Sequence, residues 1–321
     1  MRRFAIFFIL SFIISQDIPT RPVHTYSIVA YDEETGQFGV AVQSHWFSVG
    51  TLVPWAEAGV GAVATQSFVK VEYGPEGLKL MREGKSAKET LAQLIAEDDG
   101  QAIRQVAMID AKGIVASHTG EKCIEAAGHQ QGKGYSVQAN LMDKPTVWPA
   151  MAKAYENAKG DLAERMMVAL EAAEAEGGDI RGKQSVAMLI VSGEPTGIPW
   201  KDKILDIQIA DHPEPLREMR RLLRVHRAYE HANQGDLYLE HDEIEKALEE
   251  YAKATEYYPE NAELPYWTAI ALAGIDQLDK ALPIFKEVFE RDPDLKRLTP
   301  RLVKAGLLPD DEELLKKIMA K

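Results

Sequence analysis

The sequence predicts an α+β layered sandwich followed by an all-α domain, and three observations lead to this prediction. Over the first two thirds of the chain, β-rich apolar runs alternate with pairs of amphipathic segments. Strand signals then stop near Arg227. From there to the end, helical segments repeat at a 34-residue spacing.

Length and composition fit two domains and exclude several classes of function. The chain has 321 residues, 45% of them hydrophobic, which corresponds to about two domains at roughly 100–200 residues each. A formal net charge of -13 argues against a sequence-independent grip on nucleic acid. The single cysteine, Cys123, excludes an intrachain disulfide and a multi-cysteine metal site, and it leaves a cysteine nucleophile open.

The first 22 residues are expected to form a signal peptide with a short lead-in. Met1-Arg2-Arg3 precedes the apolar run FAIFFILSFIIS, which suits the hydrophobic region of a secretory signal and is shorter than the ~20 residues of a membrane span. We therefore expect export to the periplasm or the extracellular space. The alternative is a membrane anchor that is not cleaved.

The predicted sandwich covers residues 23–211 and begins with strands. The first starts at Thr25 (TYSIVAY), a turn (DEETG) joins it to FGVAVQS, and a third run begins at Gly59 (GVGAVATQS). These runs are small and apolar on both faces, which is typical of strands covered on both sides.

Helix pairs and further strands complete the sandwich. One helix is expected over 74–83, and a second begins at the capping box of Ser86 and Glu89. A hairpin around Lys112 and the strand YSVQANL follow. Helices over 145–159 and 161–176 then precede the last strands, QSVAMLIVS and ILDIQIAD. Antiparallel hairpins separated by helix pairs indicate two sheets with helices on both outer faces.

The all-α part is divided into a helical linker (212–226) and helical repeats with a capping helix (227–321). The repeated positions are Ala247, Tyr251, Ala254 and Pro259, which recur 34 residues later as Ala281, Phe285, Val288 and Pro293. This is the tetratricopeptide period, in which small residues let helices approach, an aromatic residue fills the groove and proline ends the second helix. The tail is either a docked helical appendage or a groove that binds a protein partner.

Polar residues gather at the predicted strand ends of the sandwich, and several chemistries use such residues. The candidates are Gln43, Ser44, His45, Gln66, Ser67, Ser117, His118, Thr119, His129, Asn140, Asp179 and Arg181. His45, His118 and His129 would supply the ligands of a three-histidine metal site, but the sequence has neither a pair of histidines four residues apart nor an H-E-x-x-H motif that would support one. Ser44 or Ser67 with a histidine is the start of a triad, although neither lies in G-x-S-x-G. Asp179 and Arg181 either cap a loop or clamp a substrate carboxylate.

Several ordered motifs resemble those of the domain-of-unknown-function 1028 family over residues 25–192. They are HTYSIVAYDEETGQFGVAVQSHWFSVG, VPWAEAGVGAVATQSF, YGPEGLKLMREGKSA, HTGEKCIEAAGH, GYSVQANLM and GGDIRGKQS. That family is placed in the superfamily of N-terminal-nucleophile (Ntn) hydrolases, which implies a four-layer αββα sandwich. The family's reaction and substrate are not established.

The resemblance implies site roles. An Ntn hydrolase attacks an amide carbonyl with the side chain of its first mature residue, while the α-amine of that residue takes the proton. Thr25, at the head of the first strand, matches this nucleophile, and Asn140 or Gln66 matches an oxyanion donor. Pro22 and His24 do not fit a signal-peptidase site before Thr25, so the role requires self-cleavage of the His24–Thr25 bond.

Taken together, the sequence leads to the hypothesis of a secreted Ntn-type amidohydrolase that acts on a small amide or peptide-like substrate without a cofactor or metal. The expected substrate-binding residues are Ser44, His45, His118, Asp179 and Arg181. The alternative is a non-catalytic ligand-binding module whose helical repeats recruit a protein partner. A metal-dependent hydrolase is a third reading. We expect no nucleic-acid partner, and a homo-oligomer stays open.

Overall fold

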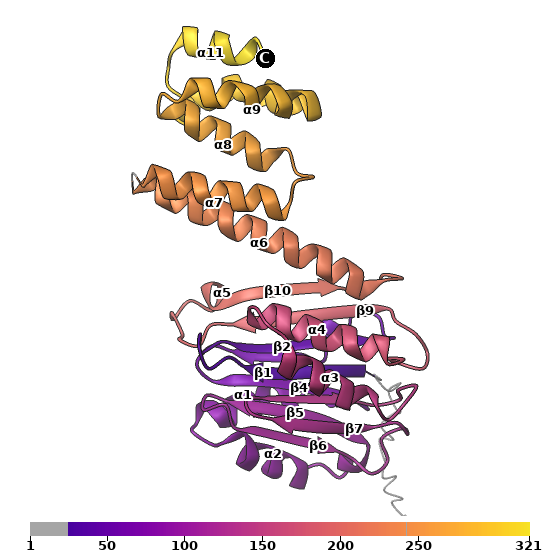
Figure 1. Cartoon of the computed structure of the whole chain (residues 1–321). Coiled ribbons are helices and arrows are strands. Elements are labelled where there is room, and N and C mark those ends of the chain that lie inside the picture. Colours follow the sequence, from indigo (N-terminus) through magenta and orange to yellow (C-terminus); the bar gives the residue numbers. More distant parts are fainter. Residues whose placement is uncertain (1–24, 242) are drawn as a thin grey trace, which may run out of the picture. The chain divides into compact units, whose positions relative to one another are not determined.

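The computed structural model describes residues 25–241 and 243–321, and it has mixed α and β structure followed by helices alone. This confirms the predicted order at that level. The chain divides into two units, residues 1–215 and 216–321, which are coloured indigo to salmon and salmon to yellow in Figure 1. The predicted signal peptide lies outside the described residues.

Two antiparallel sheets form the first unit. The six-stranded sheet has, in order, β10 (Lys203–Ile209), β9 (Ser185–Val191), β2 (Phe38–Ser44), β1 (Thr25–Tyr31), β8 (Tyr135–Ala139) and β7 (Gly128–Gly132). The four-stranded sheet has β3 (Pro54–Glu57), β4 (Gly61–Ser67), β5 (Arg104–Asp110) and β6 (Val115–Thr119). Strands β1 and β2 contact β4 across the space between the sheets, so the sheets pack face to face.

Each sheet carries a pair of helices on its outer face (Figure 1). On the four-stranded sheet these are α1 (Tyr73–Arg82) and α2 (Ala87–Ala96). On the six-stranded sheet they are α3 (Val147–Asn157) and α4 (Leu162–Ala175). The Ser86 hydroxyl accepts from the Glu89 N–H while the Glu89 carboxylate accepts from the Ser86 N–H, so the expected capping box is present. A short helix, α5 (Pro199–Asp202), precedes β10.

Among the strands, β3 and β7 are the two that the sequence pattern did not predict. Both lie at a sheet edge. The β7 sequence GHQQG has no apolar residue, and its central residues are exposed. Because an edge strand gains its order from pairing with one neighbour, here β8, its own sequence carries little periodic signal.

The second unit consists of helices. They are α6 (Pro215–Glu240), α7 (Ile244–Tyr257), α8 (Glu263–Gly274), α9 (Leu278–Arg291), α10 (Pro293–Ala305) and α11 (Glu312–Met319). The repeated small and aromatic positions of α7 and α9 are buried. The predicted linker and the start of the predicted repeats lie on one continuous helix, α6. None of the helices within the described ranges has the length and apolar character needed to cross a membrane.

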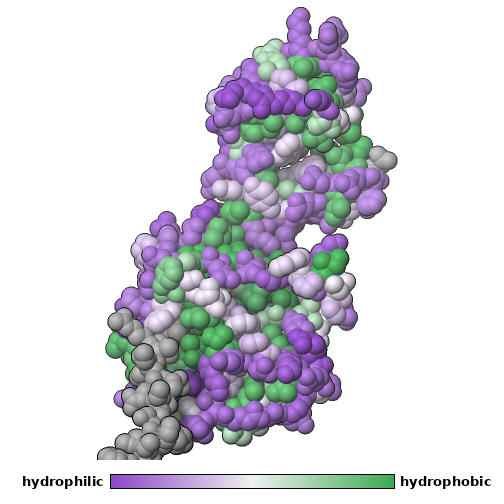
Figure 2. Space-filling view, turned by 180° about the vertical axis from the view of Figure 1, so that it is seen from behind, coloured by the Kyte–Doolittle hydropathy of each residue, from purple (hydrophilic) through white to green (hydrophobic). Residues whose placement is uncertain are grey.

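Hydrophilic side chains cover much of the surface of each unit in the face drawn in Figure 2, with smaller hydrophobic areas between them. The chemistry of interest lies inside the first unit, between its sheets.

Candidate functional site

The space between the two sheets is apolar in one half and polar in the other. The apolar half contains Val29, Val40, Val42, Ala107 and Ile109, all buried. Side chains alternate between the two faces of a strand, so residues two positions apart share a face, and the polar half continues the same rows toward the strand ends. It contains Ser27, Gln66, Gln105, Gln138 and Asn140, which are 0% exposed. A buried amide layer of this kind needs internal hydrogen bonds to offset its desolvation.

Thr25 begins β1 at this polar end, and it is 0% exposed. It lies opposite Ser44, the last residue of β2, and its Oγ1 donates a hydrogen bond to Ser44 Oγ at 3.1 Å. The Thr25 carbonyl oxygen accepts from the Asn140 backbone N–H at 3.1 Å and from Gln66 Nε2 at 3.1 Å. Asn140 Nδ2 lies 3.5 Å from the same oxygen. Both the hydroxyl group and the carbonyl oxygen of Thr25 are thus held by hydrogen bonds to residues of other segments.

Gln105 on β5 joins these amides into one network. Its Oε1 accepts from Gln66 Nε2 at 2.7 Å and from Asn140 Nδ2 at 2.9 Å. Gln66 Oε1 in turn accepts from the Ser27 hydroxyl at 2.6 Å. The N–H groups of Gln66 and Asn140 therefore point to Gln105 and the Thr25 carbonyl. The two residues expected as oxyanion donors are placed where they hold the backbone of Thr25.

The network continues from Gln105 to the surface. Gln105 Nε2 donates to Ala139 O at 2.9 Å and to Thr119 Oγ1 at 2.9 Å. Thr119 Oγ1 is 2.8 Å from His129 Nδ1. A fixed chain of hydrogen bonds thus leads from the carbonyl of Thr25 through Asn140 and Gln105 to the imidazole of His129.

Thr119 and His129 line an open cavity of about 570 Å³ at this end of the unit. Its lining residues are Thr119, Gly120, Glu121, Cys123, Glu125, Ala126, Ala127, Gly128, His129 and Trp148. Most of them belong to the loop between β6 and β7. That volume is in the range of small-molecule sites.

The backbone around the cavity is tied down in uncommon conformations. Ser67, Ala126 and Leu141 have φ values of 70°, 57° and 57°, a left-handed region that is unfavourable for residues other than glycine. The Leu141 and Met142 N–H groups donate to the carbonyls of Ile124 and Ala126. Such strained positions persist only where surrounding contacts determine them, and they cluster at functional sites.

Cys123 lines the cavity as a thiol. Burial raises the pKa of its sulfhydryl group, and its Sγ donates to the Arg104 carbonyl at 3.3 Å. A cysteine nucleophile needs a lowered pKa to supply thiolate near neutral pH. The environment of Cys123 therefore disfavours the nucleophilic role that composition had left open.

Asp179 and Arg181 form a pair within one loop. Asp179 Oδ1 accepts from Arg181 Nε at 3.0 Å and Oδ2 accepts from Arg181 Nη2 at 2.6 Å. The Asp179 side chain is 0% exposed, and its Oδ2 also accepts weakly from the His45 N–H at 3.4 Å. This geometry fixes the loop beside the end of β2, whereas a role in binding a substrate carboxylate stays a prediction.

The three histidines considered as metal ligands lie on three different segments of the first unit. His118 is on the outward face of β6, and its Nε2 is 2.8 Å from the Gln101 carbonyl. His45 follows β2, and His129 is bonded to Thr119. Within the described part of the chain, no group of three or more His, Cys, Asp or Glu side chains is placed to hold a metal ion.

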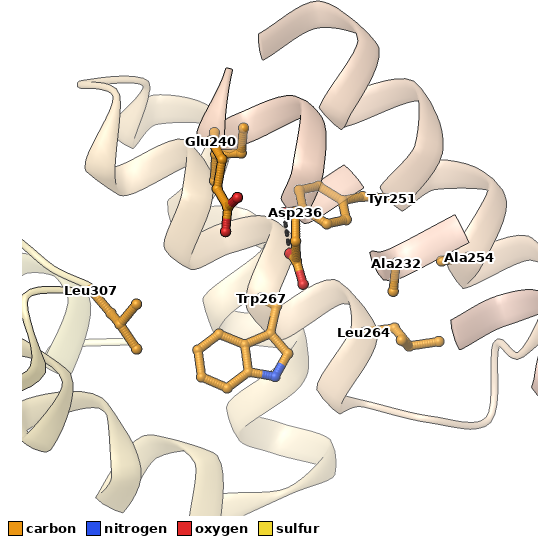
Figure 3. Close-up of a pocket in the computed structure, with 9 residues that line it drawn as sticks. Ala232, Asp236, Glu240, Tyr251, Ala254, Leu264, Trp267 and Leu307 are labelled. Atoms are coloured by element: carbon orange, nitrogen blue, oxygen red, sulfur yellow. Dashed lines mark hydrogen bonds between the residues drawn. The ribbon is translucent and has the colours of Figure 1, made fainter. Parts of the chain in front are cut away.

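The helical unit has a cavity of its own, of about 490 Å³. Figure 3 shows that Trp267 and Leu307 face Asp236 and Glu240 across it. Tyr251 donates to Asp236 Oδ1 at 2.6 Å. Burial raises the pKa of Tyr251 and the adjacent carboxylate of Asp236 raises it further, so the phenol remains a donor. The cavity is an apolar groove with two carboxylates at one side.

Sequence reasoning missed the residues that connect the site. Gln105 and Trp148 were not selected, and His129 was considered only as a metal ligand. Gln105 sits in a strand whose remaining residues are hydrophobic or charged, and an isolated buried glutamine in a strand was the signal that could have identified it.

Comparison with known proteins links the first unit to a family. A model described as a family of unknown function (DUF1028) matches residues 25–219. A crystal structure of a Silicibacter pomeroyi protein of the same family is similar, with 28% identity and a TM-score of 0.56. The similarity covers 63% of this chain and 85% of that one. None of the curated proteins matches this chain.

Proposed function

Because the chain belongs to the DUF1028 family, whose function is unknown, we propose from its geometry that it is an amidohydrolase of the N-terminal-nucleophile type. The position of Thr25 carries the proposal. Thr25 begins a central strand, and its side chain lies in the polar space between two facing sheets, against Ser44. The helix pairs on both outer faces agree with the αββα order of that superfamily.

The proposed reaction uses two groups of one residue. Thr25 Oγ1 attacks the carbonyl carbon of the substrate amide, and its proton passes to the α-amine of Thr25. An α-amine suits this task because its ordinary pKa of about 7.7–8.0 is close to neutral pH. The proton then goes to the leaving nitrogen, and water hydrolyses the resulting ester to release the acid and restore the hydroxyl.

Maturation precedes this chemistry, because His24 precedes Thr25 in the sequence. In the proposed step Thr25 Oγ1 attacks the carbonyl carbon of His24. The peptide nitrogen receives the proton and becomes the α-amine, and water hydrolyses the ester. Our proposal includes the expected export of the chain by its N-terminal segment, so that this event takes place outside the cytoplasm.

Gln66 and Asn140 act as positioning residues in this proposal. Their amide nitrogens lie 3.1 Å and 3.5 Å from the Thr25 carbonyl oxygen, and both also donate to Gln105. Donors that are already engaged hold Thr25 in a fixed orientation, which lowers the reorganisation needed for attack.

The mature N-terminus of the exported protein tests the proposal. N-terminal sequencing and intact mass are expected to give a chain that starts at Thr25. A β-lactone probe is then expected to acylate its hydroxyl, adding the whole mass of the probe. Thr25→Ser should retain both properties and Thr25→Ala should lose both, whereas Thr51→Ala, at an exposed threonine, should retain them. A mature start at Asp17, with Thr25 internal, would contradict the α-amine mechanism.

The groove in the helical unit supports a second function, the recruitment of a protein partner through a tetratricopeptide-like tail. Its occupant in this proposal is a short peptide with a lysine or arginine between apolar residues. Trp267, Leu264 and Leu307 supply apolar surface, and Asp236 and Glu240 supply complementary charge.

Two capped peptides test this second function, acetyl-Leu-Lys-Leu-amide and acetyl-Leu-Glu-Leu-amide. The lysine peptide is expected to bind more tightly in calorimetry, and Trp267→Ala and Asp236→Asn should weaken it. Leu237→Ala is the matched control, because Leu237 is 48% exposed on α6 and does not line the groove. Equal binding of the two peptides would refute the proposed occupant.

A further inference from the structure

The cavity lined by Thr119 and His129 is connected to Thr25 by hydrogen bonds. These bonds determine which ring nitrogen of His129 carries the proton. Gln105 Nε2 can only donate, so Thr119 Oγ1 accepts its hydrogen bond. The Thr119 hydroxyl proton is then available for His129 Nδ1, 2.8 Å away. This pattern assigns Nδ1 as the acceptor and leaves the proton of the neutral ring on Nε2.

His129 is favoured in that neutral form. Burial lowers its pKa, and the electrostatic interaction with the His118 imidazole lowers it further. At neutral pH the ring therefore has one N–H group, at Nε2. Since His129 lines the cavity, this N–H is a donor for a ligand oxygen, and an amide carbonyl is such an acceptor.

The rest of the lining is suited to a cation. Trp148 is partly exposed in the cavity, and the backbone of Gly128 fixes its position. A Cβ on Gly128 would lie 2.5 Å from the indole, so only glycine lets the ring pack there. Glu121 and Glu125 are exposed at the same cavity, and the described residues that line it include no lysine or arginine. An indole face with carboxylates attracts an ammonium or guanidinium group.

We infer that this cavity binds the cationic part of an amide substrate, with a carbonyl oxygen of the ligand on His129 and the cation between Trp148 and the two glutamates. Thr25 itself does not line the cavity. The inference rests on the proposed amidohydrolase function, for which it names the substrate class: amides of basic amino acids and peptides that contain a basic residue. His129 and Trp148 are specificity-determining residues in it.

Calorimetry with the catalytically silent Thr25→Ala protein separates binding from turnover. The probes are L-argininamide, which is a cationic amide, and N-acetylglycinamide, which is a neutral one. Argininamide is expected to bind at least tenfold more tightly. Trp148→Ala should weaken its binding by about 3- to 30-fold, the range that a cation–π contact gives. Trp200→Ala, at an indole 82% exposed elsewhere in the unit, should leave it unchanged.

Two further variants separate the two halves of the ligand. Replacing both glutamates (Glu121→Gln with Glu125→Gln) should reduce the preference for argininamide to the part that Trp148 supplies, and it should leave acetylglycinamide binding unchanged. His129→Phe keeps a ring without a donor and should weaken both probes alike. Equal binding of the two probes by the parent, or equal effects of Trp148→Ala and Trp200→Ala, would overturn the inference. Argininamide binding without turnover in wild-type protein would retain the cavity assignment and refute only the amidohydrolase.

Discussion

The hydroxyl of Thr25 donates a hydrogen bond to the hydroxyl of Ser44 across neighbouring strands, at a distance of 3.1 Å. Both residues are 0% exposed and lie opposite each other at the ends of β1 and β2. Because the strand pairing sets this distance, the direction of the Thr25 hydroxyl is a property of the sheet.

The Ser44 contact predicts a specific effect on the reactivity of Thr25. Ser44→Ala removes the acceptor, and the loss of one hydrogen bond worth about 1–1.5 kcal/mol corresponds to a decrease of roughly tenfold. We expect the rate of acylation by the β-lactone probe to fall by that factor, while Ser44→Thr keeps it within about twofold of the parent. Equal acylation rates for the alanine and threonine variants would show that Ser44 does not orient the nucleophile.

Replacing Gln105 should lower the stability of the fold substantially. Gln105→Leu leaves the amide donors of Gln66 and Asn140 without their shared acceptor. Each buried unsatisfied group costs about 1–3 kcal/mol, so the free energy of unfolding should fall by roughly 2–6 kcal/mol in urea titrations. Gln130→Leu, on the exposed part of β7, should change it by at most about 0.5 kcal/mol. Similar values for the two variants would contradict a structural role for the network.

The carboxylate of Asp98 should contribute to the stability of the fold in a way that is lost in acid. Its carboxylate accepts from Arg104 Nε at 2.9 Å and from the Gly100 N–H at 3.0 Å. Burial alone raises the pKa of Asp98, but these bonds outweigh it and leave the pKa below the ordinary value of 3.8. A carboxyl whose pKa is lower in the folded state stabilises the fold above its unfolded pKa, and the contribution is lost as the pH falls through the folded pKa.

Urea unfolding of Asp98→Asn and the parent at two pH values tests this. At pH 6 the variant should be less stable by about 1–3 kcal/mol, because the Arg104 guanidinium loses its charged partner. Below pH 3.8 the difference should shrink as the parent carboxyl takes up its proton. A difference that stays constant over this interval would show that the ion pair does not titrate with folding.

The position of Gly235 leaves no room for a larger side chain in the helical unit. A Cβ at this position on α6 would lie 2.6 Å from the Tyr251 ring. Gly235→Ala should therefore destabilise the α6–α7 contact by about 1–3 kcal/mol. Gly274→Ala is the matched control, because its Cβ would meet nothing within 4 Å, and it should stabilise α8 by up to about 1 kcal/mol. Amide hydrogen exchange in α6 and α8 measures both, and faster exchange in α6 is expected only for the first variant.

The sequence by itself determined the features that depend on near neighbours. The Ser86–Glu89 capping box and the helix beginning near Asp161 follow from residues within one turn. The 34-residue spacing marked Tyr251 and Phe285 as core positions, and both are buried. Thr25 could be chosen because it starts a strand and matches a family motif.

Only the tertiary structure decided what surrounds Thr25. Gln66 and Gln105 lie on two strands of one sheet, and Asn140 directly follows β8 of the other sheet. Their convergence depends on strand order and on how the sheets face each other. The contact between Gln105 and Thr119 and the position of Trp148 against Gly128 depend on the same packing. Periodicity and propensity describe residues a few positions apart, whereas these contacts join distant segments of the chain. The polar network and its cavity therefore became visible only in the folded molecule.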